Sequence, residues 1–289
     1  MPFLTKKALS LGTLCLLLAM PIAYANNSIP ANISTMAESG GYINSEVALV
    51  MSLDDNQVHY AKNMNTVRPI ASITKLMTAL VITRSKINLD EIITITDEDI
   101  DRLKSSSSRL MVGTSLTRRD ALHLALMSSE NRAAHALART YPGGVNAFVR
   151  EMNLMARHIG MTRSRFVEPT GLSPLNVASP QDLVRLLQAT SKEKLIHQLS
   201  TSDDHTIIAR NGRALQYHNT NRLVRNNDWN INISKTGYIR EAGNCLVMIS
   251  KVEGKDMAIV LLNAENRNTR FTDAIRVRHI VQNDYPSLY

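Results

Sequence analysis

The stretch ASITKLMTAL, residues 71–80, sets the interpretation of the whole chain. It predicts the start of an apolar helix, yet Ser72 stands at its beginning and Lys75 follows one turn later. Residues three apart share a helix face, so the Lys75 amine can reach the Ser72 hydroxyl in a cleft. The positive helix N-terminus and partial burial would both lower the Lys75 pKa. A neutral lysine can take the serine proton and activate Ser72 as a nucleophile.

The Ser-x-x-Lys pattern alone is weak, because it recurs at Ser191 and Lys194 among charged residues, where we expect solvated side chains. Two other patterns each occur once: Ser129 with Asn131 between two expected helices, and Lys-Thr-Gly at 235–237 after an apolar strand. Singly they read as a helix cap and a strand ending in a turn. In this order, the three patterns are typical of penicillin-binding proteins and class A β-lactamases.

The chain resembles the low-molecular-mass penicillin-binding proteins, serine DD-peptidases that act on peptidoglycan. The resemblance runs from about residue 40 to about residue 265 and is carried by five segments: RPIASITKLMTAL, LALMSSENRAAHALARTYPGG, VEPTGLSPLNVASPQDL, YHNTNRL and KTGYIREAGNCLVM. Within them, SITK, SSENRAA and EAG-x-CLVM look most like the D-alanyl-D-alanine endopeptidase branch, of the penicillin-binding protein 7 type.

The resemblance implies roles for the residues of the first two patterns. Ser72 is implied to be the nucleophile and Lys75 its general base. Ser129 is implied to relay a proton toward the leaving amine, and Asn131 to hold the substrate backbone and orient Lys75. The implied activity is hydrolysis of peptide cross-links through an acyl-enzyme, with inhibition by β-lactams.

The resemblance also implies substrate-binding roles on the third pattern. Lys235 and Thr236 would bind the substrate carboxylate, and Lys235 would help to keep Lys75 neutral. Gly237 would let the backbone approach, and the N–H groups of Ser72 and Tyr238 would form the oxyanion hole. A strand that carries these residues can also pair with an extended peptide.

Several alternatives to an endopeptidase stay open. Many carboxypeptidase relatives have His and Thr where this chain has Tyr238 and Ile239, so we expect a preference for cross-links, with a carboxypeptidase as the alternative. A β-lactamase would use a water-activating Glu such as Glu168, but Gly171 and Leu172 stand where that pattern has Leu-Asn. A non-catalytic peptidoglycan-binding module and a plain esterase are further alternatives.

The order of expected elements predicts the fold class. Strands are expected over 46–53 and 57–62, helices over most of 72–192, five further strands from 205 to 263, and a last helix over about 271–283. This order predicts an α+β fold of the β-lactamase/DD-peptidase type. We expect an antiparallel sheet flanked by helices, with an all-helical lobe inserted over about 72–192.

The ends of the chain predict export to the periplasm. Lys6 and Lys7, an apolar run and the small residues of AYA predict a signal peptide, residues 1–25, cleaved after Ala25. Residues 26–45 should form an exposed leader, and 46–289 the catalytic domain. We expect no C-terminal β-domain and no membrane anchor after signal removal, because too few residues follow Lys235.

Composition and single residues narrow the expected partners. The formal net charge of +8 suits an anionic wall polymer, whereas export and an aromatic content of 4% argue against nucleic acid. We expect peptidoglycan and β-lactams as partners. No His pair has zinc-binding helical spacing with Glu, so we expect no metal and no cofactor. Cys15 leaves with the signal, and Cys245 on an apolar strand should be a buried, inert thiol.

Overall fold

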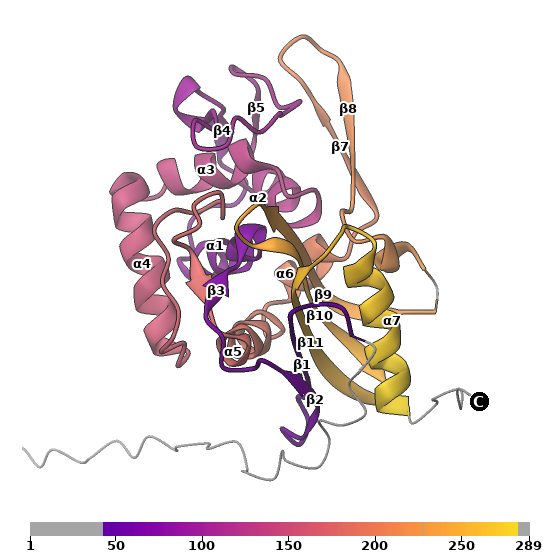
Figure 1. Ribbon diagram of the computed structural model, residues 1–289. Coiled ribbons are helices and arrows are strands. Elements are labelled where there is room, and N and C mark those ends of the chain that lie inside the picture. Colours follow the sequence, from indigo (N-terminus) through magenta and orange to yellow (C-terminus); the bar gives the residue numbers. More distant parts are fainter. Residues whose placement is uncertain (1–42, 227, 283–289) are drawn as a thin grey trace, which may run out of the picture. The chain divides into compact units, whose positions relative to one another are not determined.

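A five-stranded antiparallel sheet forms one lobe of the protein (Figure 1). The structure is a computed structural model that describes residues 43–226 and 228–282. The strands follow the order β2-β1-β11-β10-β9, and their bounds are β1 (Val47–Ser52), β2 (Val58–Lys62), β9 (Asn230–Ile239), β10 (Gly243–Val252) and β11 (Lys255–Ala264). The first strand pairs with the last, Val47 lying opposite Leu262. The strand β9, which carries Lys-Thr-Gly, lies at an edge of the sheet.

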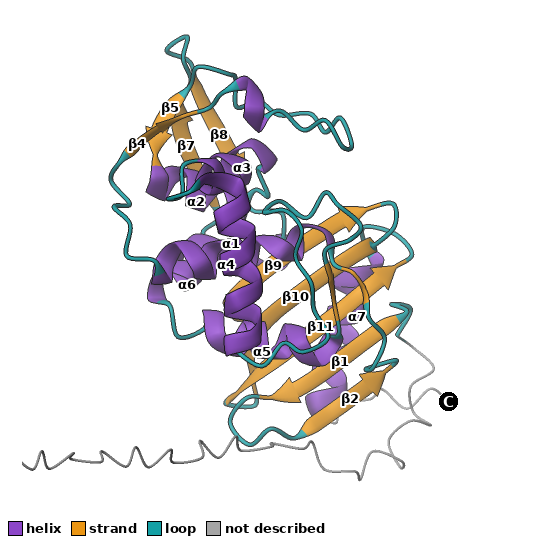
Figure 2. Ribbon diagram, turned by 90° about the vertical axis from the view of Figure 1, so that its left-hand side faces the viewer, coloured by secondary structure: helices purple, strands orange, loops and turns teal. Residues whose placement is uncertain are grey.

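Alternation of side chains along the strands gives the sheet two apolar faces. Along β1, Ala48 and Val50 face one side and pack in the same core as Phe271 and Ala274 of α7 (Thr269–Gln282). Val47 and Leu49 point to the opposite face, where the other helices pack. Because successive residues of a strand point to opposite faces, a run of buried residues such as β1 requires cover on both sides. Figure 2 shows the sheet between α7 and the helical lobe.

The helical lobe is built around α1 (Thr74–Arg84). Nine of its eleven residues are buried, from Thr74 to Ile82, so this helix is surrounded on all sides. The surrounding helices are α2 (Arg118–Met127), α3 (Asn131–Arg139), α4 (Gly144–His158), α5 (Pro180–Thr190) and α6 (Lys194–Ser200). The helix α5 begins at Pro180, and the Ser179 side chain caps it by accepting from the Asp182 N–H.

Three short ribbons accompany these two layers. Inside the helical lobe, β3 (Arg68–Pro69) pairs with β6 (Val177–Ala178), and β4 (Ile92–Thr94) with β5 (Ser115–Thr117). The lobe is therefore mainly but not purely helical. The strands β7 (Asp204–Ile208) and β8 (Ala214–His218) pair only with each other and form a projecting hairpin (Figure 1).

The predicted fold class is confirmed, an α+β arrangement of an antiparallel sheet and a helical lobe. The last helix begins at Thr269, two residues before its predicted start, and is described as far as Gln282. The signal peptide over 1–25 and most of the leader over 26–45 lie outside the described residues. Within the described ranges, no helix has both the length and the apolar character needed to cross a membrane.

Candidate active site

Ser72 lies in a tight 3₁₀ turn, Ala71–Ile73, directly before α1. The sequence placed Ser72 in the helix itself. The backbone of Ala71 has a φ of +47°, a left-handed conformation that is unfavourable for a residue with a side chain. Two glycines enclose this turn: a Cβ on Gly171 would lie 1.9 Å from the Ala71 oxygen, and one on Gly237 would lie 3.1 Å from the Ser72 nitrogen. The backbone at these two glycines packs directly against the turn and leaves little or no room for a side chain. This close packing holds the turn in place.

Lys75 lies directly beneath Ser72 and is fully buried, with 0% of its surface exposed. The expectation of only partial burial is wrong, because the structure buries this side chain completely. Its Nζ lies 2.9 Å from the Ser72 Oγ, 2.7 Å from the Asn131 Oδ1 and 2.6 Å from the carbonyl oxygen of Thr170. Three oxygen atoms from three different segments thus surround this amine.

Burial lowers the pKa of Lys75 from its ordinary value to about 8. The charged form loses its hydration in the interior, and no carboxylate forms a salt bridge with it in the described part of the chain. Carboxylates further away, chiefly Glu168 and Glu130, oppose this fall in pKa. Desolvation is therefore the main cause, and of the two effects expected from the sequence it is the burial that the structure confirms.

The orientation of Asn131 is fixed by Ser106. The Asn131 Nδ2 donates to the Ser106 Oγ at 2.9 Å, so Oδ1 must face Lys75. Ser106 is held in turn by Asp101, whose Oδ2 accepts from the Ser106 N–H at 2.8 Å. No structure or role was predicted for this segment, whose only signal was the run of four serines over 105–108.

The Thr170 carbonyl is positioned by Glu168. The carboxylate of Glu168 accepts from the N–H groups of Thr170 and Gly171, at 2.6 and 2.7 Å, and from the Asn176 Nδ2 at 2.9 Å. Asn176 also donates to the Thr74 Oγ1 at 3.1 Å, which fastens this loop to the start of α1. Glu168 therefore organises the loop around Ser72 and Lys75, a function that the sequence did not suggest.

Ser129 lies between α2 and α3 in a left-handed conformation, with a φ of +63°. It does not cap α3, because the side chain of Glu130 accepts from the Arg132 N–H in that position. The Ser129 hydroxyl is instead 3.0 Å from the Nζ of Lys235. This contact joins the second sequence pattern to the third.

Lys235 and Thr236 lie side by side on the edge strand and are both buried. The pKa of Lys235 is lowered well below its ordinary value, first by burial and then by repulsion from Lys75 and Arg270. The Thr236 Oγ1 donates to the Thr220 Oγ1 at 2.7 Å. Thr220 therefore belongs to the site, although the sequence pointed only to its segment, YHNTNRL.

Residues around Gly237 complete this side of the site. Arg270 of α7 donates from its Nη1 to the carbonyl oxygens of Gly237 and Cys245, each at 3.0 Å. Cys245 is buried as expected, and burial raises the pKa of its thiol to about 11. The Tyr238 side chain is 62% exposed, and the oxyanion-hole role of its N–H stays a prediction.

The structure thus brings the predicted residues together in two linked groups. One group joins Ser72, Lys75 and Asn131, and the other joins Ser129 and Lys235 with Thr236. The close approach of Gly237 to the Ser72 nitrogen brings the two groups side by side. A search of residues 43–226 and 228–282 finds no cluster of three His, Cys, Asp or Glu side chains that could hold a metal ion.

Comparisons with known proteins agree on one family. The D-alanyl-D-alanine carboxypeptidase family matches residues 33–266. A D-alanyl-D-alanine endopeptidase of Pseudomonas aeruginosa is 44% identical over 94% of this chain and 87% of its own length. A D-alanyl-D-alanine endopeptidase of Escherichia coli is 42% identical over 94% of this chain and 88% of its own.

Solved structures give the same class. A Streptomyces DD-transpeptidase aligns with a TM-score of 0.76 and 26% identity, over 82% of this chain and 97% of that one. A penicillin-binding protein of Listeria monocytogenes, in its ampicillin-bound form, aligns with a TM-score of 0.71 and 25% identity, over 83% and 98%. The fold and the site therefore define a serine peptidase of the penicillin-binding class. The chain belongs to the D-alanyl-D-alanine carboxypeptidase family, and the predicted recognition is confirmed.

Proposed function

We propose that this protein is a D-alanyl-D-alanine endopeptidase that hydrolyses the peptide cross-links of peptidoglycan through an acyl-enzyme on Ser72. The proposal rests above all on the surroundings of one amine, the Nζ of Lys75. Two of its three neighbours, the Asn131 Oδ1 and the Thr170 carbonyl, can only accept hydrogen bonds. A neutral lysine has two N–H bonds and one lone pair. With both N–H bonds donated to these acceptors, the lone pair is left for the Ser72 O–H.

This arrangement supplies a general base for acylation. As the Ser72 Oγ attacks the D-Ala carbonyl, its proton passes to the Lys75 Nζ. The C–N bond then breaks, Ser129 passes its hydroxyl proton to the leaving amine, and the proton held by Lys75 replaces it on Ser129, which leaves Lys75 neutral again. In the second step a water molecule gives a proton to Lys75 and attacks the ester. The Ser72 Oγ leaves as the alcohol by taking that proton back from Lys75. A pKa of about 8 keeps enough Lys75 neutral for this cycle near neutral pH.

We assign substrate binding to the edge strand. An extended peptide can add to the free edge of β9, where its carboxylate would lie near Lys235 and Thr236. The buried Lys235 has no carboxylate partner among the described residues, so an arriving anion would restore the charge that burial disfavours. Backbone N–H groups of Ser72 and Tyr238 would stabilise the oxyanion.

The position of Glu168 argues against a β-lactamase. A water-activating carboxylate needs a free oxygen directed at the acyl group. Both oxygens of Glu168 instead accept hydrogen bonds from their own loop, including those of Thr170 and Gly171. We therefore expect bound penicillin to leave slowly. A pure binding module is disfavoured as well, because binding alone does not require a lysine buried against the Ser72 hydroxyl.

The endopeptidase assignment follows the relatives that are 42–44% identical and bear that name. The family's description as carboxypeptidases favours cleavage of a terminal D-Ala as the second candidate. We further infer that the protein acts in the periplasm on wall polymer and that β-lactams acylate Ser72. The net charge of the full chain is +8, and the +6 that remains once Lys6 and Lys7 leave with the signal suits that anionic surrounding.

Digestion of a purified, cross-linked muropeptide dimer tests the proposal, with products identified by mass spectrometry. We expect conversion of dimer to monomers by the wild-type protein and none by Ser72→Ala. Removal of one terminal D-Ala with the cross-link intact would instead establish the carboxypeptidase. Binding without any cleavage by the wild type would establish the non-catalytic module.

A further inference from the structure

A second cavity lies next to the site, between the loop that follows Ser106 and the β7–β8 hairpin. Its volume is about 550 Å³, and Ser108, Arg109, Arg213 and His218 are among the residues that line it. We propose that this cavity is a subsite for the carboxylates of the departing peptide strand. The inference deepens the proposed function and rests on it, since only an endopeptidase has a second peptide strand as its leaving group.

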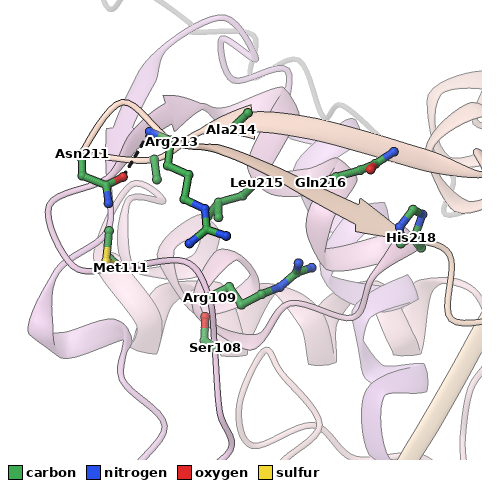
Figure 3. A pocket seen from close by; sticks show the side chains of 10 residues that line it. Ser108, Arg109, Met111, Asn211, Arg213, Ala214, Leu215, Gln216 and His218 are labelled. Carbon is green, nitrogen blue, oxygen red and sulfur yellow. Dashed lines mark hydrogen bonds between the residues drawn. The ribbon is translucent and has the colours of Figure 1, made fainter.

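The cavity is lined by two arginines that have no acidic partner. Figure 3 shows the side chains of Arg109, from the loop, and Arg213, from the hairpin, reaching into the space between these two segments. Both residues are exposed, and neither forms a salt bridge within the described part of the chain. Arginine binds carboxylates through paired N–H donors, so two such groups facing one hollow form a receptor for anions.

The Arg109 side chain is held in place by an aromatic ring. Its guanidinium lies over the ring of the buried Tyr217, 4.3 Å from the ring centroid. At the hairpin tip, the backbone N–H of Arg213 donates to the Asn211 Oδ1 at 3.2 Å, the bond drawn in Figure 3, which fixes the turn that carries Arg213. A third arginine, Arg210, lies against Gly113 beside the cavity. No Asp or Glu is among the lining residues, so the local charge is positive.

The cavity lies on the side from which the leaving strand departs. The Ser108 hydroxyl in its wall donates to the Glu130 Oε1 at 2.8 Å, and Glu130 directly follows Ser129. His218 in its wall lies two residues before Thr220, whose hydroxyl contacts Thr236. Two short paths therefore connect the cavity wall with the residues proposed to act on the leaving amine and to bind the substrate: Ser108 through Glu130 to Ser129, and His218 through Thr220 to Thr236.

A smaller cavity on the other side of Asn131 has the opposite character. It has a volume of about 260 Å³ and borders Thr170, and its lining includes Asp101 and Glu168. An acid-rich hollow is thus lined by Asn131 and Thr170, the partners of Lys75, and a basic hollow is lined by Ser108, the partner of Glu130. Peptide stems of the wall carry free carboxylates, so the basic side suits the strand that leaves. The subsite would add affinity for a cross-link and none for a single D-Ala.

The main test compares substrates with and without these carboxylates. We expect Arg109→Gln combined with Arg213→Gln to lower kcat/KM for a cross-linked dimer about tenfold, chiefly through KM. Acylation by benzylpenicillin, which has no leaving strand, should not change. A dimer with amidated carboxylates on the leaving stem should be cleaved equally by wild type and variant. The matched control is Arg150→Gln, an exposed arginine on α4 outside both cavities.

Any of three results would overturn the subsite. The double variant could cleave the dimer at the wild-type rate, or its penicillin acylation could fall in parallel with its dimer cleavage. The control Arg150→Gln could also lose as much dimer cleavage as the double variant. A binding experiment separates this failure from failure of the proposed function. Full-length Ser72→Ala is titrated with an uncross-linked tetrapeptide stem, free or amidated. If Ser72→Ala binds the free stem and the added substitutions Arg109→Gln and Arg213→Gln abolish this binding, the subsite is supported even if the wild type leaves the dimer intact. Equal binding of the free stem with and without the two arginines refutes the subsite.

Discussion

The chain contains the Ser-x-x-Lys pattern twice, and the two copies differ in burial and in the contact between serine and lysine. At Ser72 and Lys75 the hydroxyl and the amine lie 2.9 Å apart, and the lysine is fully buried. At Ser191 and Lys194 both residues are exposed, as predicted. Ser191 ends α5 and donates to the carbonyl of Gln188, whereas Lys194 is the first residue of α6.

The difference lies in the surroundings, not in the spacing. The second copy spans a break between two helices, so its residues do not share one helical face. Both of its residues are also exposed to solvent, so no loop encloses the amine. In the first copy, Asn131 and Thr170 supply hydrogen-bond acceptors and burial lowers the pKa of the lysine, and these are the surroundings that the proposed nucleophile and base require. Local pattern and distant loops are both required.

The largest expected effect separates the two serines. Ser72→Ala should lower acylation by a fluorescent penicillin about 10⁴-fold or more, because no other hydroxyl replaces the nucleophile. Ser191→Ala should acylate at the wild-type rate. Labelling followed by gel electrophoresis measures both. Equal labelling of Ser72→Ala and wild type would remove Ser72 from the mechanism.

The next effect separates the two lysines. A guanidinium does not become neutral at accessible pH, so Lys75→Arg should lose general-base catalysis and acylate about 10³-fold more slowly. Lys194→Arg keeps an exposed charge and should have no effect. Stopped-flow acylation with a chromogenic β-lactam gives the rates, and circular dichroism checks that each variant is folded.

The pH dependence should differ from that of an ordinary lysine. Only the neutral form of Lys75 accepts the Ser72 proton. With a pKa of about 8, its neutral fraction falls about tenfold for each pH unit below that value. Acylation rates should therefore rise from pH 6 to about 8 and then level off. A rate that stays constant between pH 6 and 8 would contradict Lys75 as the base, and Lys194→Arg should reproduce the wild-type profile.

A smaller effect is expected from the loop that covers the first copy. Glu168→Gln removes one carboxylate oxygen and the charge that holds Thr170 and Gly171, and should lower the free energy of unfolding by about 1–3 kcal/mol. Acylation should slow by about tenfold as the Thr170 carbonyl moves. Thermal denaturation and penicillin acylation measure the two changes. Selective loss of deacylation alone would instead make Glu168 a water-activating base.

The sequence predicted the fold class and most of the cluster for a physical reason. Residues close in the sequence, such as Ser129 and Asn131, are held near each other by local backbone geometry. Such pairs can therefore be found from the sequence alone. Ser106 and Thr170 could not be found in this way, because one contributes a hydroxyl and the other a backbone carbonyl from irregular loops. The full burial of Lys75 was missed as well, since burial is decided by segments far away in the sequence.

The pairing of β1 with β11 has a consequence for how the protein matures. Val47 lies opposite Leu262, so the sheet closes only when nearly the whole chain is present. Pairings between residues so distant form late and slowly in folding. The strand that carries Lys235 is joined to β1 only through β10 and β11. A chain still being synthesised therefore lacks the complete sheet, and we expect activity only after the last strand has paired.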